Sequence, residues 1–321
     1  MEKIVCSVVV PVYNEEEVIN ETYKRLKSVM DGLDITYEII FVNDGSRDRT
    51  RELALEICKN DSNIKFVDFA RNFGHQTAIT AGMDYASGDA IVVIDADLQD
   101  PPEVIPEMLE KWREGYEVVY GQRVKREGET AFKKFTAKVF YRTLNKLTDV
   151  EIPVDTGDFR LIDRKVCDAL KQVDERNRYI RGIISWLGFR SIAVPFVREK
   201  RFAGTTKYPL KKMLKFASDA IISFSYKPLK LATYFGFFLS FASFVYLIVT
   251  VILKLFNVTQ TVEGWASLVA IMLFFNGIIL LILGIIGEYI GRIYDEAKGR
   301  PLYVVREIIN FDDTKSIKSG R

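Results

Sequence analysis

Two long uncharged runs near the C-terminal end constrain the fold of this chain most. Residues 231–253 and 264–287 contain no Asp, Glu, Lys or Arg. A helix of about 20 apolar residues crosses the hydrocarbon core of a bilayer, and each run is long enough. A buried helical hairpin in a large soluble protein is the alternative, but two neighbouring runs of this length disfavour it. We therefore expect two transmembrane helices within residues 229–290.

Basic side chains flank the two runs on their outer sides. They are Lys207, Lys211, Lys212, Lys215, Lys227 and Lys230 before the first run, and Arg292, Lys298, Arg300 and Arg306 after the second. The intervening loop carries little charge beyond Lys254 and Glu263. Because Lys and Arg accumulate in cytoplasmic loops, both termini and the N-terminal region are expected in the cytoplasm.

The overall composition excludes some classes of function. The 45 Lys and Arg residues nearly balance the 43 Asp and Glu residues, which gives no signature of nucleic-acid binding. Cys6, Cys58 and Cys167 lie far apart, without the paired spacing of zinc or redox sites. An odd number of scattered cysteines fits a reducing compartment such as the cytosol.

Apolar runs alternate with helical patterns over residues 1–208. Strands are expected at 5–12, 38–42, 65–69, 90–94 and 117–120. Asn14 is expected to cap the first helix, and Ser46 or Asp48 is expected to cap the second. The third helix is expected over Gly74–Tyr85, and the fourth is expected to begin at Pro101. Repeated βα units of this kind predict a mostly parallel sheet covered by helices.

Polar residues follow three of the expected strands, at Tyr13–Glu15, Asn43–Ser46 and Asp95–Asp97. Ligands of parallel sheets bind at the carboxyl ends of the strands, where these residues meet. In an extended chain Asp95 and Asp97 point to the same side, roughly 6 to 7 Å apart. Carboxylates so placed suit Mg²⁺ or Mn²⁺, although a plain polar loop is the alternative. No Gly-x-Gly-x-x-Gly or Gly-Lys-Ser/Thr loop is present, which disfavours dinucleotide oxidoreductases and P-loop NTPases.

Four segments carry a family resemblance: Pro11–Glu16, Val42–Ser46, Arg71–Gln76 and Asp95–Glu103. Together they resemble the family 2 inverting glycosyltransferases of the GT-A fold. With Gly157–Arg160, Arg201–Lys207 and the two uncharged runs added, the chain resembles polyprenyl-phosphate glycosyltransferases of the bactoprenol glucosyltransferase type, which are related to dolichyl-phosphate mannose synthases. The resemblance covers nearly the whole chain and implies a bacterial inner or plasma membrane protein.

The resemblance also implies roles for individual residues. Donor-binding positions are Pro11, Tyr13, Glu15, Asp44 and Asp95, and metal ligands for Mg²⁺ or Mn²⁺ are Asp97 and Gln99, with Asp95 near the ribose or the metal. Asp158 resembles the catalytic aspartate, while Asp155 remains a competing base and Arg160 could pair with either. His75, the only histidine, is expected near the donor in a structural rather than a catalytic role.

Several basic residues have two interpretations. Arg201 is a candidate catalytic cation and Lys207 a candidate donor-binding cation that stabilise the leaving diphosphate, and membrane anchoring is the alternative for both. Arg123, Lys133 and Lys134 are candidate ligands of the acceptor phosphate, and a solvated basic face is the alternative. Such a lipid monophosphate is largely dianionic at neutral pH and is already a nucleophile.

The expected domain organisation follows the chain. A GT-A domain occupies residues 1–208 and includes an interfacial amphipathic helix at about 131–147. A juxtamembrane amphipathic helix at 209–228, the two spans at 229–290 and a cytoplasmic tail at 291–321 follow. Small residues within the spans would also permit a homo-oligomer; they are Gly236, Gly277 and Gly284.

The sequence thus predicts metal-dependent, inverting transfer of one sugar from a nucleotide sugar, with UDP-glucose and undecaprenyl phosphate favoured by the resemblance. GDP-mannose or another sugar donor remains an alternative, as does a non-catalytic scaffold that binds nucleotide sugar or lipid at the membrane. A processive polysaccharide synthase is disfavoured, because residues 178–182 read Arg-Tyr-Ile-Arg-Gly in place of the Gln-x-x-Arg-Trp acceptor motif.

Overall fold

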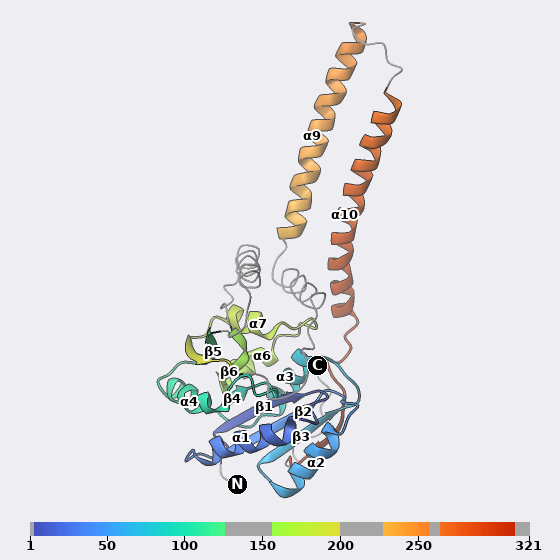
Figure 1. Cartoon of the computed structure of the whole chain (residues 1–321). Coiled ribbons are helices and arrows are strands. Elements are labelled where there is room, and N and C mark those ends of the chain that lie inside the picture. The colour runs from blue at the N-terminus through green and yellow to red at the C-terminus, as the bar shows by residue number, and fades with distance from the viewer. Residues whose placement is uncertain (1–2, 126–155, 200–226, 257–263, 312–321) are drawn as a thin grey trace.

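The computed structural model describes residues 3–125, 156–199, 227–256 and 264–311, which form an α/β domain and two long helices (Figure 1). Two expected amphipathic helices lie outside these residues: all of the one at 131–147 and nearly all of the one at 209–228. So do the side chains of Lys133, Lys134, Asp155, Arg201 and Lys207.

Eight strands of the described residues form one sheet, in the order β7-β5-β6-β4-β1-β2-β3-β8. Their bounds are β1 Cys6–Val12, β2 Tyr37–Asn43, β3 Ile64–Phe69, β4 Ala90–Val93, β5 Val118–Lys125, β6 Thr156–Asp163, β7 Ser191–Val197 and β8 Val305–Ile309. The neighbours β4-β1-β2-β3 are parallel, as are β5 and β7. Strand β6 is antiparallel to β4 and β5, and β8 is antiparallel to β3. The prediction of a mostly parallel α/β sheet is confirmed.

Helices cover both faces of the sheet and bury its apolar side chains (Figure 1). On one face lie α1 Ile19–Asp31, α2 Thr50–Asn60 and α4 Ile105–Arg113; on the other lie α3 His75–Tyr85, α6 Arg164–Lys171 and α7 Ile180–Leu187. Alternate residues of β1 face the two layers: Val8 and Val10 pack against the first set of helices, and Val9 packs against the second.

The starts of two helices differ from the sequence prediction, and at a third only one of the two candidate residues bonds the helix start. Asn14 does not cap the first helix, because its side chain bonds the neighbouring loop and α1 begins only at Ile19. Ser46 is engaged with the backbone of Asn14, whereas Asp48 Oδ1 does accept the N–H of Thr50, the first residue of α2. A single 3₁₀ turn at Pro102–Val104 precedes α4, so Pro101 lies just before the helical segment it was expected to begin.

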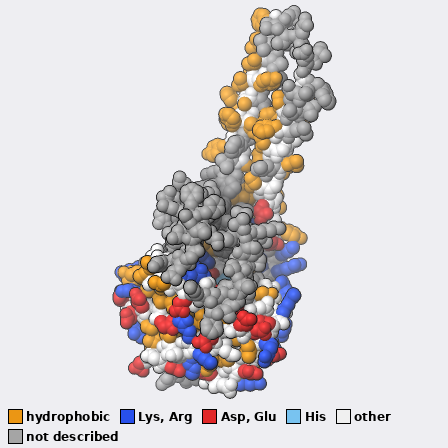
Figure 2. All heavy atoms as spheres, in the orientation of Figure 1, with side chains coloured by type: hydrophobic (Ala, Val, Ile, Leu, Met, Phe, Trp, Pro, Cys, Tyr) orange, Lys and Arg blue, Asp and Glu red, His pale blue; other side chains and the backbone are white. Residues whose placement is uncertain are grey.

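Helices α9 Lys227–Leu255 and α10 Trp265–Ala297 extend away from the α/β domain as a hairpin (Figure 1). Their surface is rich in exposed apolar side chains, including Phe237 at 75% and Leu280 at 69% exposure (Figure 2). Among the described residues, only the stretch Phe274–Ala297 of α10 is long and apolar enough to cross a bilayer. The apolar stretch Gly236–Tyr246 of α9 is shorter, so one of the two expected spans is supported.

The chain returns to the α/β domain after α10. Strand β8 adds to the sheet edge beside β3, and Tyr303 is fully buried, with its ring stacked on Phe69 at 5.2 Å between centroids. The Tyr303 hydroxyl donates to Asp84 at 2.9 Å. A tail was expected from residue 291, but residues 291–297 belong to α10 and residues 305–309 form β8. Tyr303, Val305 and Ile308 add their side chains to the core of the domain.

Candidate active site

The loops after β1 and β2 are bound to each other at the carboxyl edge of the sheet. The N–H of Asn14 donates to Ser46 Oγ at 3.0 Å, and Asn14 Oδ1 accepts the N–H of Arg47 at 2.8 Å. The N–H of Glu15 donates to Thr50 Oγ1 at 2.8 Å. These bonds fix the β1 loop, which carries the expected donor-binding residues Tyr13 and Glu15, beside the β2 loop. Pro11, the other expected donor-binding residue of this region, lies in β1 itself.

Asp44 connects the β2 loop to the segment before α3. Its carboxylate is buried and accepts the N–H groups of Phe73 at 2.6 Å and Gly74 at 3.0 Å, together with the Asn72 side-chain amide at 2.9 Å. Burial raises the pKa of Asp44, although the N–H groups of Phe73 and Gly74 oppose that rise. Its oxygens are already used to hold this loop, and its contact with a donor stays a prediction.

Gly45 makes the close approach of these loops possible. Its φ is +66°, and a Cβ there would lie 2.4 Å from the carbonyl carbon of Arg71. Any larger residue would push the two loops apart, because that contact is to backbone rather than to a flexible side chain.

The segment after β4 alternates between open and buried residues. Asp95, Asp97 and Gln99 are partly exposed, whereas Leu98 and Asp100 are buried. The expected metal ligands thus share the open side of the segment, as their spacing predicted. Asp97 Oδ1 accepts the N–H of Gln99 at 3.1 Å, which stabilises the turn between them.

The residues on this open side fit a hard divalent cation. Asp95 Oδ1 is buried and accepts no hydrogen bond, so it retains a lone pair for a ligand. The described residues contain no convergent group of three His, Cys, Asp or Glu side chains that would hold a metal alone. Mg²⁺ usually takes one or two carboxylates and completes its shell with waters and substrate phosphates, which suits Asp95 and Asp97. Gln99 Oε1 accepts from Arg198 Nη2 at 2.6 Å and would have to release it to join them.

Asp158 lies at the centre of a closed hydrogen-bond cluster. Its Oδ1 accepts from Arg181 Nε at 2.8 Å, and its Oδ2 lies 3.2 Å from His75 Nε2 and accepts from the Gln76 side chain at 3.2 Å. The same His75 nitrogen is 3.4 Å from Asp95 Oδ1. His75 therefore links the expected catalytic aspartate to the first carboxylate of the Asp95–Gln99 segment.

The charges in this cluster shift one another's proton affinity. Burial would raise the pKa of Asp158, but Arg181 and His75 hold it well below its usual range. Burial likewise favours neutral His75, yet its bond to Asp158 and the charge of Asp95 raise its pKa to about 9. Burial raises the pKa of Asp95 to about 6, with His75 opposing the rise. At neutral pH the cluster holds ionised Asp158 and protonated His75, and Asp158 is a weak proton acceptor.

Two arginines have partners other than those expected. Arg160 does not pair with Asp158, because it donates to the carbonyl of Gly157 at 3.0 Å and Arg181 occupies the carboxylate. Arg123, a candidate ligand of the acceptor phosphate, bonds both oxygens of Asp100 with its Nη2 at 3.1 Å. Asp100 is only 1% exposed, so this arginine is fixed at the edge of the site.

Sequence reasoning missed the residues that complete the cluster. Arg181, Gln76 and Arg198 were given no role. His75 was given mainly a structural one, although its Nε2 lies 3.2 Å from Asp158 and 3.4 Å from Asp95. One signal for Arg181 was present, since it lies in the Arg-Tyr-Ile-Arg segment that takes the place of the absent acceptor motif. His75 and Gln76 lie in the Arg71–Gln76 segment that carries the family resemblance, but nothing local in the sequence links that segment to Asp158.

Comparison with known proteins agrees with this geometry. The model of the family described as "Glycosyl transferase family 2" matches residues 7–171. These residues include β2 to β6, all of β1 but Cys6, and the Asp158 cluster except Arg181. The chain belongs to glycosyl transferase family 2. A second model, described as "GtrB C-terminal hairpin", matches residues 227–293, which correspond to α9 and most of α10. The protein is therefore a glycosyltransferase enzyme.

Curated relatives share nearly the full length of this family 2 chain. An uncharacterized glycosyltransferase of Bacillus subtilis, YkcC, is 61% identical over 96% of this chain and 95% of its own. An uncharacterized glycosyltransferase of Synechocystis, sll0501, is 49% identical over 94% and 95%. The bactoprenol glucosyl transferase of Shigella phage SfII is 41% identical over 94% and 97%. The expected likeness to the bactoprenol glucosyltransferase type is confirmed.

Proposed function

We propose that this enzyme transfers a single sugar, with inversion, from UDP-glucose to a polyprenyl phosphate such as undecaprenyl phosphate at the cytoplasmic membrane face. The observation that carries the proposal is the contact of His75 with both Asp158 and Asp95, at 3.2 and 3.4 Å. It joins a charged cluster to an open pair of carboxylates at the ligand-binding edge of the sheet. The name of the Shigella phage relative supports glucose as the sugar and bactoprenol as the acceptor.

A divalent cation, Mg²⁺ or Mn²⁺, is proposed at Asp95, Asp97 and Gln99. Bound there, it would offset the negative charge that develops on the departing nucleotide diphosphate. Protonated His75 adds a fixed positive charge at the same edge. Arg201 and Lys207 follow β7 in the sequence. Their positive charges are also proposed to stabilise the departing diphosphate.

The donor nucleotide is proposed to lie along the loops after β1 and β2. Pro11 lies near the end of β1, Tyr13 and Glu15 belong to the first loop, and Asp44 fixes the second. The fixed loops would hold the base and ribose, while the Asp95–Gln99 segment meets the diphosphate.

In the proposed reaction an oxygen of the lipid phosphate forms a bond to the anomeric carbon. The bond from that carbon to the diphosphate oxygen breaks, and its electron pair leaves with UDP. Because the acceptor phosphate is dianionic, no proton has to be removed from it. Asp158, with its pKa held well below the usual range, therefore acts by positioning His75 and Arg181 rather than as a strong base.

The acceptor must reach this site from a membrane. The exposed apolar surface of α9 and α10 supports a two-span hairpin in the bilayer, although only the α10 stretch is long enough among the described residues. Arg123, Lys133 and Lys134 are proposed to face the acceptor phosphate.

The test is turnover by the purified full-length protein in lipid nanodiscs. Undecaprenyl phosphate, Mg²⁺ or Mn²⁺ and a panel of UDP- and GDP-sugars would be supplied, with released nucleotide and lipid product measured. We expect a single glucose on the lipid with UDP-glucose only. Turnover confined to GDP-mannose would show a mannose synthase, and binding of nucleotide sugar without turnover would show a scaffold; either result contradicts the proposal.

A further inference from the structure

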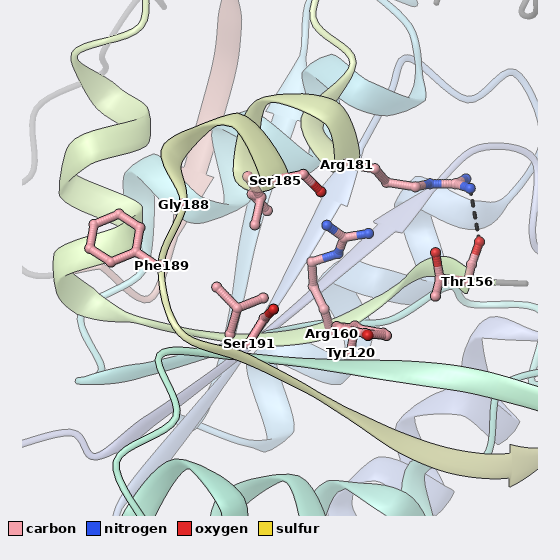
Figure 3. Close-up of a pocket in the computed structure, with 10 residues that line it drawn as sticks. Tyr120, Thr156, Arg160, Arg181, Ser185, Gly188, Phe189 and Ser191 are labelled. Atoms are coloured by element: carbon pink, nitrogen blue, oxygen red, sulfur yellow. Dashed lines mark hydrogen bonds between the residues drawn. The ribbon is translucent and has the colours of Figure 1, made fainter. Parts of the chain in front are cut away.

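A polar cavity of about 210 Å³ lies beside the Asp158 cluster. Residues of β5, β6, α7 and the start of β7 line it (Figure 3). Its polar lining consists of two guanidinium groups and four hydroxyl groups, from Arg160, Arg181, Tyr120, Thr156, Ser185 and Ser191. The volume greatly exceeds the roughly 10–15 Å³ that one water needs on this measure, so a larger polar group can enter.

Arg160 forms no direct ion pair with a described residue, although the carboxylate of Asp158 lies near enough to favour its charge. It is 5% exposed, its Nη2 donates to the Gly157 carbonyl, and its Nε is buried without a hydrogen-bond partner. Figure 3 shows its guanidinium directed into the cavity toward Ser185. Burial lowers the pKa of Arg160 to about 10, which leaves it charged at neutral pH. A buried guanidinium whose Nε makes no hydrogen bond is costly, because it has lost its hydration and Asp158 is bonded to Arg181 instead.

Arg181 connects the cavity to the active site. Its Nε bonds Asp158 at 2.8 Å, and its Nη1 donates to the Thr156 carbonyl at 3.0 Å (Figure 3). The two arginines and the one carboxylate leave a net charge of +1 around the cavity. By contrast, Arg123 is neutralised by the buried carboxylate of Asp100.

We propose that this cavity binds a phosphate monoester, with Arg160 as its main partner and Arg181 at its wall. The planar guanidinium matches the geometry of phosphate oxygens, and charged hydrogen bonds of this kind are the strong ones. The hydroxyl groups of the lining supply further donors. Two sources share this chemistry, the headgroup of the lipid acceptor and free inorganic phosphate. The lipid source rests on the proposed function. It places the acceptor phosphate beside the Arg181–Asp158 pair rather than on Arg123, whose charge is already balanced by Asp100.

The test is a calorimetric titration of the full-length protein in nanodiscs with inorganic phosphate and with a soluble short-chain prenyl phosphate. Arg160→Gln removes the cation, and Ser185→Leu fills the cavity without changing any charge. Ser28→Leu, on the exposed surface of α1, is the matched control. We expect the dissociation constant for phosphate to rise about tenfold or more in the first two variants and to stay unchanged in the control.

The readouts separate the two sources and the two proposals. A raised KM for the lipid phosphate in Ser185→Leu indicates the acceptor headgroup, whereas an unchanged KM with weakened inorganic phosphate binding indicates free phosphate. Equal phosphate affinity in wild type and Ser185→Leu overturns the cavity site, even if Arg160→Gln does not fold. Absence of sugar transfer by wild type with every donor overturns the proposed function alone, because the phosphate titration does not depend on turnover.

Discussion

The Asp158 cluster and the Asp95–Gln99 segment lie at the same edge of the sheet but differ in how their charges are satisfied. Asp158 is 6% exposed and is contacted by Arg181, His75 and Gln76. Asp95, 3.4 Å from the same histidine, has a buried oxygen with no hydrogen bond. The protein itself satisfies both oxygens of Asp158. In the second region, one oxygen of Asp95 is left without a hydrogen bond.

This difference separates positioning from binding. A closed cluster is pre-organised, so it costs no reorganisation when a substrate arrives. Partly exposed carboxylates can supply one or two oxygens to a cation that completes its shell with waters and substrate phosphates. His75 touches both regions and would transmit the orientation fixed by Asp158 to the edge where the donor binds.

The largest effect is expected from the open region. Asp97→Asn should lower sugar transfer by about 10²–10³-fold or more, because the bound cation loses a charged ligand while the fold is kept. Initial rates at saturating metal and UDP-glucose would measure this. Asp168→Asn, an exposed position on α6, is the matched control and should transfer at the wild-type rate. Wild-type turnover by Asp97→Asn would show that Asp97 does not bind a cation needed for transfer.

In the closed region, Asp158→Asn should slow transfer by about 10–100-fold with little change in UDP binding. The amide keeps the shape of the side chain but removes the charge that orients His75 and Arg181. Replacing a residue that orients the groups of a site lowers activity by about 10–100-fold. Unfolding free energy should fall by about 1–3 kcal/mol, because Arg181 loses its charged partner. Calorimetric UDP binding and chemical denaturation measure the two effects. Loss of UDP binding would show that Asp158 belongs to the donor site instead.

The shared histidine gives a pH test of the comparison. Its folded pKa of about 9 lies above its ordinary value of about 6.5. The stability that it contributes is therefore complete below pH about 6.5 and is lost as the pH rises through about 9. The unfolding free energy of wild type should exceed that of His75→Gln by more at pH 6 than at pH 9.5, measured with EDTA present. A pH-independent difference would mean that the cluster does not hold the imidazolium.

The smallest effect is expected away from both regions, where β8 closes the sheet. Tyr303→Phe keeps the ring stacked on Phe69 but removes the hydroxyl that donates to Asp84. Unfolding free energy should fall by about 0.5–1.5 kcal/mol, and the transfer rate should not change. This variant also serves as the pH-independent control for His75→Gln. An unchanged stability would show that the returning C-terminal segment is not anchored by that bond.

Periodicity and strand-end chemistry predicted much of the fold. The five expected strands all exist, because buried parallel strands read as apolar runs, and Asp95, Asp97 and Gln99 share one open side as their spacing required. The helix starts were less accurate, since Asn14 and Ser46 bond across two loops rather than along their own helices. The sequence around a residue does not predict hydrogen bonds to another loop.

The closed cluster could not be read from the sequence for a similar reason. His75, Asp158 and Arg181 come from α3, β6 and α7, and only the packing of these elements brings them together. Strand β8 was missed because it follows a long apolar helix and pairs with a strand more than 200 residues earlier. Pairing over that separation depends on the hairpin returning the chain to the domain.

Manganese binding tests the central contrast most directly. Electron paramagnetic resonance of the full-length protein titrated with Mn²⁺ in the presence of UDP would follow the loss of the free-ion signal. Wild type and Asp168→Asn should bind one ion each, and Asp97→Asn should bind it at least about tenfold more weakly. Equal Mn²⁺ affinity in all three proteins would place the cation elsewhere and contradict the assignment of the open strand edge.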